Sequence, residues 1–172
     1  VYHVYTVDIH SIRAASVLAE IENAAARTKE EEEFLRIYRS VPKKHLLNLA
    51  VLLHDIGKGK GHGHSSIGAE IVARLGPRMG LSEAETSDLV FLVLQHLLMA
   101  HTSQRRDLHD IELILSFADA VGTTSRLDQL YLLTYADLRE VGPDVWTQWK
   151  AMLLAELYDK TRNVQETGKL KR

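Results

Sequence analysis

The chain has 172 residues, of which 45% are hydrophobic and 26% charged, which is enough for one globular domain with a core of its own. Its formal net charge of -2 argues against nucleic-acid or membrane partners, so an anionic ligand would have to meet a local cluster of cations. The absence of cysteine excludes disulfides, thiolate zinc sites and cysteine nucleophiles, and it fits the cytoplasmic location that we expect. The longest apolar run, residues 49–53, is too short to span a bilayer.

The N-terminal residues have neither an initiator methionine nor the basic and apolar regions of a signal peptide. We therefore interpret the chain as a segment of a longer protein. Within it we expect one domain over residues 1–162. A polar, basic tail over residues 163–172 is expected to fray.

Apolar residues recur at helical spacing along most of the chain, and no alternating strand pattern is present. The predicted helices span residues 7–23, 30–38, 44–56, 66–75, 82–98, 110–120, 125–141 and 144–161. The fold class that follows is all-α, a helical bundle.

Three local features define this pattern. The helix over 44–56 is apolar nearly all round and should be buried. Gly76-Pro77 is expected to end the fourth helix, and Ser82 opens the fifth at capping-box spacing. A polar loop is expected between residues 98 and 110, and the last helix should carry Trp149 and Met152 on its apolar side.

His54-Asp55 ends the most apolar helix, where an ionised carboxylate needs a partner because burial without one is costly. Imidazole and carboxylate together suit a divalent cation. The alternative is a buried hydrogen bond between the two side chains. A second pair, His109-Asp110, opens a helix and is explained by capping alone.

Further histidines and a distant aspartate make the metal interpretation stronger. His10 lies on an otherwise apolar helix face, and Asp137 lies in a mostly apolar helix where packing gives no reason for an acid. His64 and His96 occur between them, one beside a predicted helix start and the other near a helix end. The order along the chain is His, His-Asp, His, His and Asp.

This order resembles the HD superfamily, whose pattern is a first His, a His-Asp pair and a distant Asp in a helical domain. Longer stretches resemble, within it, the HD domains of the bifunctional uridylyltransferase/uridylyl-removing enzymes. These stretches are residues 2–10, 54–59, 64–65, 95–99, 104–107, 136–137, 142–143 and 146–150. The resemblance covers nearly the whole chain, and it implies an HD-domain helical bundle with a metal site between core helices.

The resemblance also implies a function. In that family a nucleotidyltransferase domain precedes the HD domain, and two ACT domains, through which glutamine regulates the enzyme, follow it. The HD domain is associated with hydrolysis of UMP from a tyrosine of the nitrogen-regulatory PII protein. No transferase motif is recognisable in this sequence, so we expect it to remove UMP but not to attach it.

The metal site implied by the resemblance contains His10, His54, Asp55 and Asp137, which would hold one Mg²⁺, Mn²⁺ or Fe ion. Asp55 is a candidate catalytic residue that could also bridge to a second ion. The ligands of that second ion would be His64 and His96. Leu97 stands where some two-metal relatives carry another His, so occupancy by one ion or two stays open.

Lys58 and the pair Arg105-Arg106 are the local cations that a net-acidic protein would need for phosphate. We expect Lys58 to act in catalysis and substrate binding, and the two arginines to bind substrate. The alternative for all three is a solvated surface.

Two other functions fit the same residues. One is HD-type hydrolysis of a free nucleotide, a cyclic nucleotide or an alarmone, and residues 104–107 and 146–150 argue against it because they match the PII-modifying family. The other is a non-catalytic domain that transmits a regulatory signal. The complete ligand set argues against that function.

Overall fold

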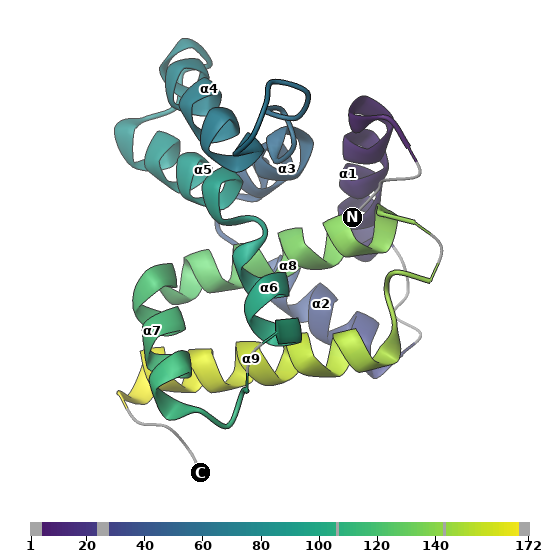
Figure 1. The fold of residues 1–172 in the computed structure, drawn as a ribbon, viewed down its shortest axis with the longest axis vertical. Coiled ribbons are helices and arrows are strands. Elements are labelled where there is room, and N and C mark those ends of the chain that lie inside the picture. The colour runs from purple at the N-terminus through teal and green to yellow at the C-terminus, as the bar shows by residue number, and fades with distance from the viewer. Residues whose placement is uncertain (1–4, 24–27, 106, 143, 169–172) are drawn as a thin grey trace.

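The computed structural model describes residues 5–23, 28–105, 107–142 and 144–168, in which helices are joined by turns and loops and no strand occurs (Figure 1). The all-α prediction is confirmed. The helices are α1 (Val7–Asn23), α2 (Lys29–Ser40), α3 (Lys44–Leu53), α4 (His64–Arg78), α5 (Glu83–Gln95), α6 (Leu98–Arg105), α7 (Ile111–Val121), α8 (Thr124–Glu140) and α9 (Gln148–Thr167). Within the described ranges, none of them is both long and apolar enough to cross a membrane.

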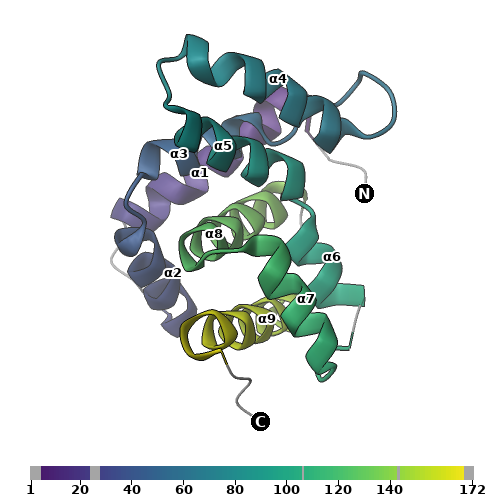
Figure 2. The same ribbon diagram turned by 90° about the vertical axis from the view of Figure 1, so that its left-hand side faces the viewer.

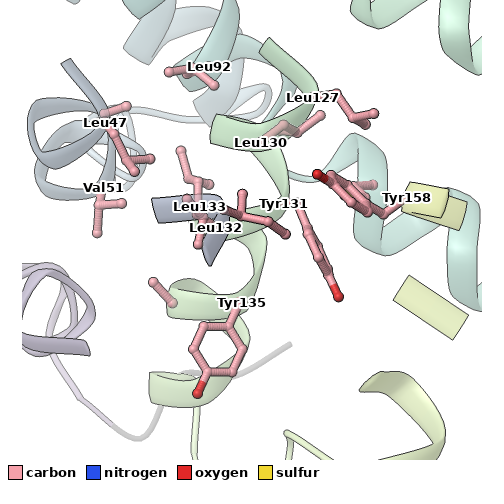
Figure 3. Packing of buried hydrophobic residues seen from close by; sticks show 14 of the residues in the cluster. Leu47, Val51, Leu92, Leu127, Leu130, Tyr131, Leu132, Leu133, Tyr135 and Tyr158 are labelled. Atoms are coloured by element: carbon pink, nitrogen blue, oxygen red, sulfur yellow. The ribbon is translucent and has the colours of Figure 1, made fainter. Parts of the chain in front are cut away.

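Helix α8 forms the centre of the bundle. Every residue from Leu127 to Asp137 is buried, because other helices cover α8 on all sides. Figure 2 shows α1, α3 and α5 on one side of α8 and α9 on the opposite side, with α2 beside them. Figure 3 shows side chains from α3, α5 and α9 around those of α8; the labelled ones are Leu47, Val51, Leu92, Leu127, Leu130, Tyr131, Leu132, Leu133, Tyr135 and Tyr158. Asp137, a carboxylate on this buried helix, therefore lies in the interior.

Side-chain caps fix several helix starts. Ser82 and Glu85 form the predicted capping box of α5, with the Glu85 amide donating to Ser82 Oγ at 3.3 Å and the Ser82 amide to Glu85 Oε2 at 2.9 Å. Asp110 caps α7 by accepting from the Glu112 amide at 3.0 Å. The pair His109-Asp110 is thus a helix cap, as its sequence context predicts.

The third helix ends earlier than predicted. It stops at Leu53 instead of residue 56, because the chain tightens into turns: the Ile56 amide donates to the Leu53 carbonyl at 3.1 Å and the Lys58 amide to the Asp55 carbonyl at 2.9 Å. His54 and Asp55 consequently lie on a turn after α3, with their side chains directed by the turn and not by a helix face.

The predictions for α4 and α6 were wrong. Helix α4 continues through Gly76 and Pro77 to Arg78, and the break comes at Gly80, whose φ is +80°. Gly76 packs against α5 so closely that a Cβ there would lie 2.5 Å from Thr86 Oγ1. The stretch expected as a loop after residue 98 contains α6, which includes His101.

The last helix is displaced from its prediction. It begins at Gln148, not 144, and runs to Thr167, so residues 163–167 are helical instead of frayed; residues 169–172 lie outside the described part. Trp149 and Met152 are 59% and 65% exposed, contrary to prediction. The stripe that α9 buries is instead formed by Leu154, Leu157, Tyr158 and Thr161.

Candidate metal centre

The structure brings together the four residues expected to hold the first cation. His10 comes from α1, His54 and Asp55 from the turn after α3, and Asp137 from α8, and all four are buried. They are separated by up to 127 residues along the chain. The packing of α1 and α3 against α8 brings these four side chains together.

The facing atoms of this group have the spacing of metal ligands. His10 Nε2 lies 2.9 Å from Asp137 Oδ1 and 3.2 Å from His54 Nε2, and His54 Nε2 lies 3.3 Å from Asp55 Oδ2. Nitrogen and oxygen ligands at about 2.1 Å from one ion, at right angles to each other, are about 3 Å apart. His10, His54 and Asp137 therefore have the spacing of ligands to one divalent cation, and Asp55 Oδ2 lies beside them.

The other ring nitrogen of each buried histidine is held by a backbone carbonyl. Nδ1 of His10 donates to the Glu140 carbonyl at 3.1 Å, Nδ1 of His54 to Val51 at 2.7 Å, and Nδ1 of His96 to Val93 at 2.7 Å. These bonds assign the Nδ1–H tautomer and leave Nε2 facing the centre as an acceptor, which is the arrangement of a metal-ligating histidine. Two such acceptors 3.2 Å apart, as in His10 and His54, require a proton or a cation between them.

Electrostatics supports the same conclusion. Burial alone would lower the pKa of His54, but Asp137 and Asp55 outweigh it and raise that pKa to about 10. Burial would raise the pKa of Asp137, but His10 and His54 hold it well below its usual range. Without metal, His54 therefore carries a positive charge between two carboxylates, a charge that a bound cation would replace.

A second group shares Asp55. Its Oδ1 atom lies 3.7 Å from both His64 Nε2 and His96 Nε2, while Oδ2 faces the first group. His64 Nε2 is a buried atom without a hydrogen-bond partner among the described residues. Burial and the charge on His54 lower the pKa of His96 to about 4, so its ring is neutral at neutral pH. An unpartnered imidazole nitrogen, a neutral imidazole and a carboxylate fit a second cation.

Gly57 sets the position of His64. A Cβ at Gly57 would lie 2.1 Å from the His64 carbonyl oxygen and 2.7 Å from the Gly68 amide nitrogen. Both are backbone atoms at the start of α4, so only glycine permits this approach. The turn that carries Asp55 and the helix that carries His64 are held together there.

The predicted phosphate-binding residues do not all meet at this centre. Lys58 donates to Asp55 Oδ2 at 2.5 Å and so lies at the cluster. Arg105 lies at the C-terminal end of α6, in a hollow between α6 and α7 that Thr102 and Phe117 also line. In the described part of the chain, no hydrogen bond or ion pair joins Arg105 to the cluster. Arg106 lies outside the described residues. Their substrate role stays a prediction.

The centre opens to solvent on one side. The side chains of His64 and Lys58 are 28% and 23% exposed, whereas those of His10, His54, Asp55 and His96 are almost completely buried. A ligand would therefore approach between the start of α4 and the turn at Lys58.

Glu140 is a positioning residue that was not expected from the sequence. Its carbonyl accepts from His10, and its carboxylate accepts from Arg13 Nε at 2.7 Å, so it connects α1 with the end of α8. It lies one helical turn after Asp137, a spacing that places both on one face of α8.

A family model described as the HD domain matches residues 7–124. The chain belongs to the HD domain family. HD domains bind divalent metal ions, and the two groups of side chains could hold them. The matched region contains His10, His54, Asp55, His64 and His96, and the fold adds Asp137 from beyond it.

Curated relatives extend the resemblance over nearly the whole chain. This HD domain is 46% identical over 167 residues to the bifunctional uridylyltransferase/uridylyl-removing enzyme of Rhodospirillum rubrum, a match that covers 97% of the chain and 18% of the relative. It is 47% identical over 161 residues to the enzyme of the same name from Zymomonas mobilis, with 92% and 17% covered. The chain thus spans less than a fifth of the length of these relatives, and the family resemblance predicted from the sequence is confirmed.

Proposed function

We propose that this HD domain hydrolyses phosphodiesters with a divalent cation held by His10, His54, Asp55 and Asp137. We further propose that it removes UMP from the uridylylated tyrosine of a PII protein. The observation that carries the proposal is the convergence in the interior of two imidazole Nε2 atoms, which lie 3.2 Å apart and each 2.9–3.9 Å from a carboxylate oxygen of Asp137 and of Asp55. The relatives are named uridylyl-removing enzymes, which supports this reaction.

Mg²⁺, Mn²⁺ or Fe bound there would lower the pKa of a water molecule and polarise a phosphoryl oxygen. The protein's own contribution is to fix the ligands. The carbonyls of Glu140 and Val51 orient the rings of His10 and His54, and the burial of both rings excludes bulk water.

Lys58 and Asp55 are the proposed catalytic residues beside the cation. Lys58 lies on the open side, where its ammonium can contact a phosphate oxygen of the substrate. A tyrosine phenolate, whose conjugate acid has a pKa of about 10, leaves without a strong general acid. The bond between phosphorus and the tyrosine oxygen breaks, water supplies the new oxygen of UMP and the proton of the phenol, and the products are UMP and PII with an unmodified tyrosine side chain.

A second cation between Asp55, His64 and His96 is a further part of the proposal. Its support is the buried, unpartnered Nε2 of His64. An ion there would share the carboxylate of Asp55 with the first, in the way that two-metal phosphoesterases bridge their ions.

The test is UMP release from uridylylated PII, followed by chromatography with Mn²⁺ or Mg²⁺ present. We expect release that a chelator abolishes and that added cation restores. A free uridine nucleotide, a cyclic nucleotide and an alarmone serve as competing substrates. If one of these is hydrolysed in preference to uridylylated PII, the substrate is a free nucleotide and the proposal of PII as substrate is wrong. Release that persists with the chelator would refute the metal mechanism.

A further inference from the structure

The ammonium of Lys58 binds the same oxygen that would bind the first cation. Lys58 Nζ donates to Asp55 Oδ2 at 2.5 Å. That oxygen lies 3.3 Å from His54 Nε2, so it is the one that faces the first group. Oδ1 of the same carboxylate faces His64 and His96 instead.

A divalent ion and an ammonium bound to this one oxygen would repel each other strongly. Asp55 is buried, and unit charges about 4 Å apart in a protein environment repel with several times the thermal energy. The single negative charge of Asp55 is too small to balance a divalent ion and an ammonium together. A divalent ion bound to Oδ2 would therefore drive the ammonium away.

The side chain of Lys58 can move away from Asp55 while its backbone stays in place. Its amide donates to the Asp55 carbonyl at 2.9 Å, which fixes the main chain in the turn. Its side chain is 23% exposed and carries the charge on a flexible four-carbon stem. A Cβ added at the adjoining Gly59 would meet no atom of the described residues within 4 Å beyond its chain neighbours, so the space next to the turn is open.

We propose that Lys58 is an internal counter-cation, which neutralises Asp55 in the metal-free protein and is displaced when the divalent ion binds. This inference rests on the proposed function, because it assumes that Asp55 Oδ2 is a ligand. The displaced ammonium lies on the open side of the centre, where a phosphate would enter. Cation binding thus precedes, and prepares, the contact of Lys58 with phosphate.

The first test measures Mn²⁺ affinity by calorimetry in the wild-type chain, Lys58→Met and Lys60→Met. Methionine keeps the apolar stem without the charge. Removing the competing ammonium should tighten Mn²⁺ binding about ten-fold or more. Lys60 is exposed in the same loop, so Lys60→Met should bind as the wild type does. Lys58→Arg keeps the charge and should also stay close to wild type.

The second test measures binding of inorganic phosphate to the Mn²⁺-loaded proteins, where Lys58→Met should bind more weakly than wild type. Equal Mn²⁺ affinities in wild type and a folded Lys58→Met would overturn the displacement. Weaker Mn²⁺ binding in Lys58→Met would overturn it too, since it would show that Lys58 assists the ion. Because neither measurement uses hydrolysis, failure to release UMP from PII would leave this inference standing. Absence of Mn²⁺ binding in the wild type would overturn both proposals.

Discussion

Asp55→Ala is expected to abolish both divalent-cation binding and hydrolysis. The carboxylate presents Oδ2 to His54 and Oδ1 to His64 and His96, so its removal takes a ligand from both groups at once. It also leaves the charge of Lys58 without its 2.5 Å partner. We expect UMP release to fall by about a thousand-fold or more, which corresponds to about 4 kcal/mol of transition-state stabilisation. Calorimetric titration with Mn²⁺ and a chromatographic assay of UMP measure the two effects.

The chain supplies a matched control in its second His-Asp pair. Asp110→Ala removes the cap of α7, which should lower the free energy of unfolding by about 1 kcal/mol and leave Mn²⁺ binding intact. Unchanged Mn²⁺ stoichiometry in Asp55→Ala would show that the assigned centre is not the binding site. A loss of Mn²⁺ binding in both variants would point to general unfolding instead.

Mg²⁺ affinity is expected to rise about ten-fold per pH unit between about pH 7 and pH 9. In the metal-free protein Asp137 and Asp55 raise the pKa of His54 to about 10 despite burial, so its ring is protonated over this range. The ion binds only the neutral ring, and each binding event must release that proton. His96 adds no proton of its own, because burial and the charge of His54 lower its pKa to about 4.

The same shift predicts a change in stability. A group whose pKa is raised in the folded state contributes stability below its unfolded pKa and loses it as the pH rises through the folded pKa. For His54 this window lies between about 6.5 and about 10, so the metal-free chain should lose stability there while the Mg²⁺-loaded chain does not. Calorimetric titration with Mg²⁺ in buffers of different ionisation enthalpy counts the protons that are released when the ion binds. An affinity that is flat between pH 7 and pH 9 is incompatible with a protonated His54 in this site.

Side-chain chemistry made much of the centre predictable from the sequence. His54-Asp55 and Asp137 stand out because a carboxylate in an apolar helix needs a partner, and the structure places His54 within 3.5 Å of Asp137. The capping residues Ser82 and Asp110 were equally predictable, since their oxygens act on amides two or three residues away.

Features that depend on packing could not be predicted in this way. The turn that follows α3 brings Gly57 against the start of α4, and α4 continues through Pro77 where Gly76 packs against Thr86. Local sequence gives no account of such contacts. The exposure of Trp149 likewise depends on which stripe of α9 faces α8, and two stripes of that helix carry apolar residues.

The two ends of α6 show how far the sequence can predict which residues meet at the metal centre. His96, just before this helix, belongs to the cluster, whereas Arg105 at its far end lies in a separate hollow. The eight-residue helix between them, which was predicted as a loop, holds Arg105 away from His96. The structure thus places the predicted histidine in the cluster, whereas the sequence could not show that the arginine lies apart from it.

The most direct test of the central claim is the position of Mn²⁺ in crystals of this chain, located by anomalous scattering at the manganese edge. We predict a peak bonded to His10 Nε2, His54 Nε2, Asp55 and Asp137, with the ammonium of Lys58 moved off Asp55. A peak elsewhere, with His10 and His54 still in contact with each other and Lys58 still on Asp55, would contradict the assignment of this cluster as the metal centre.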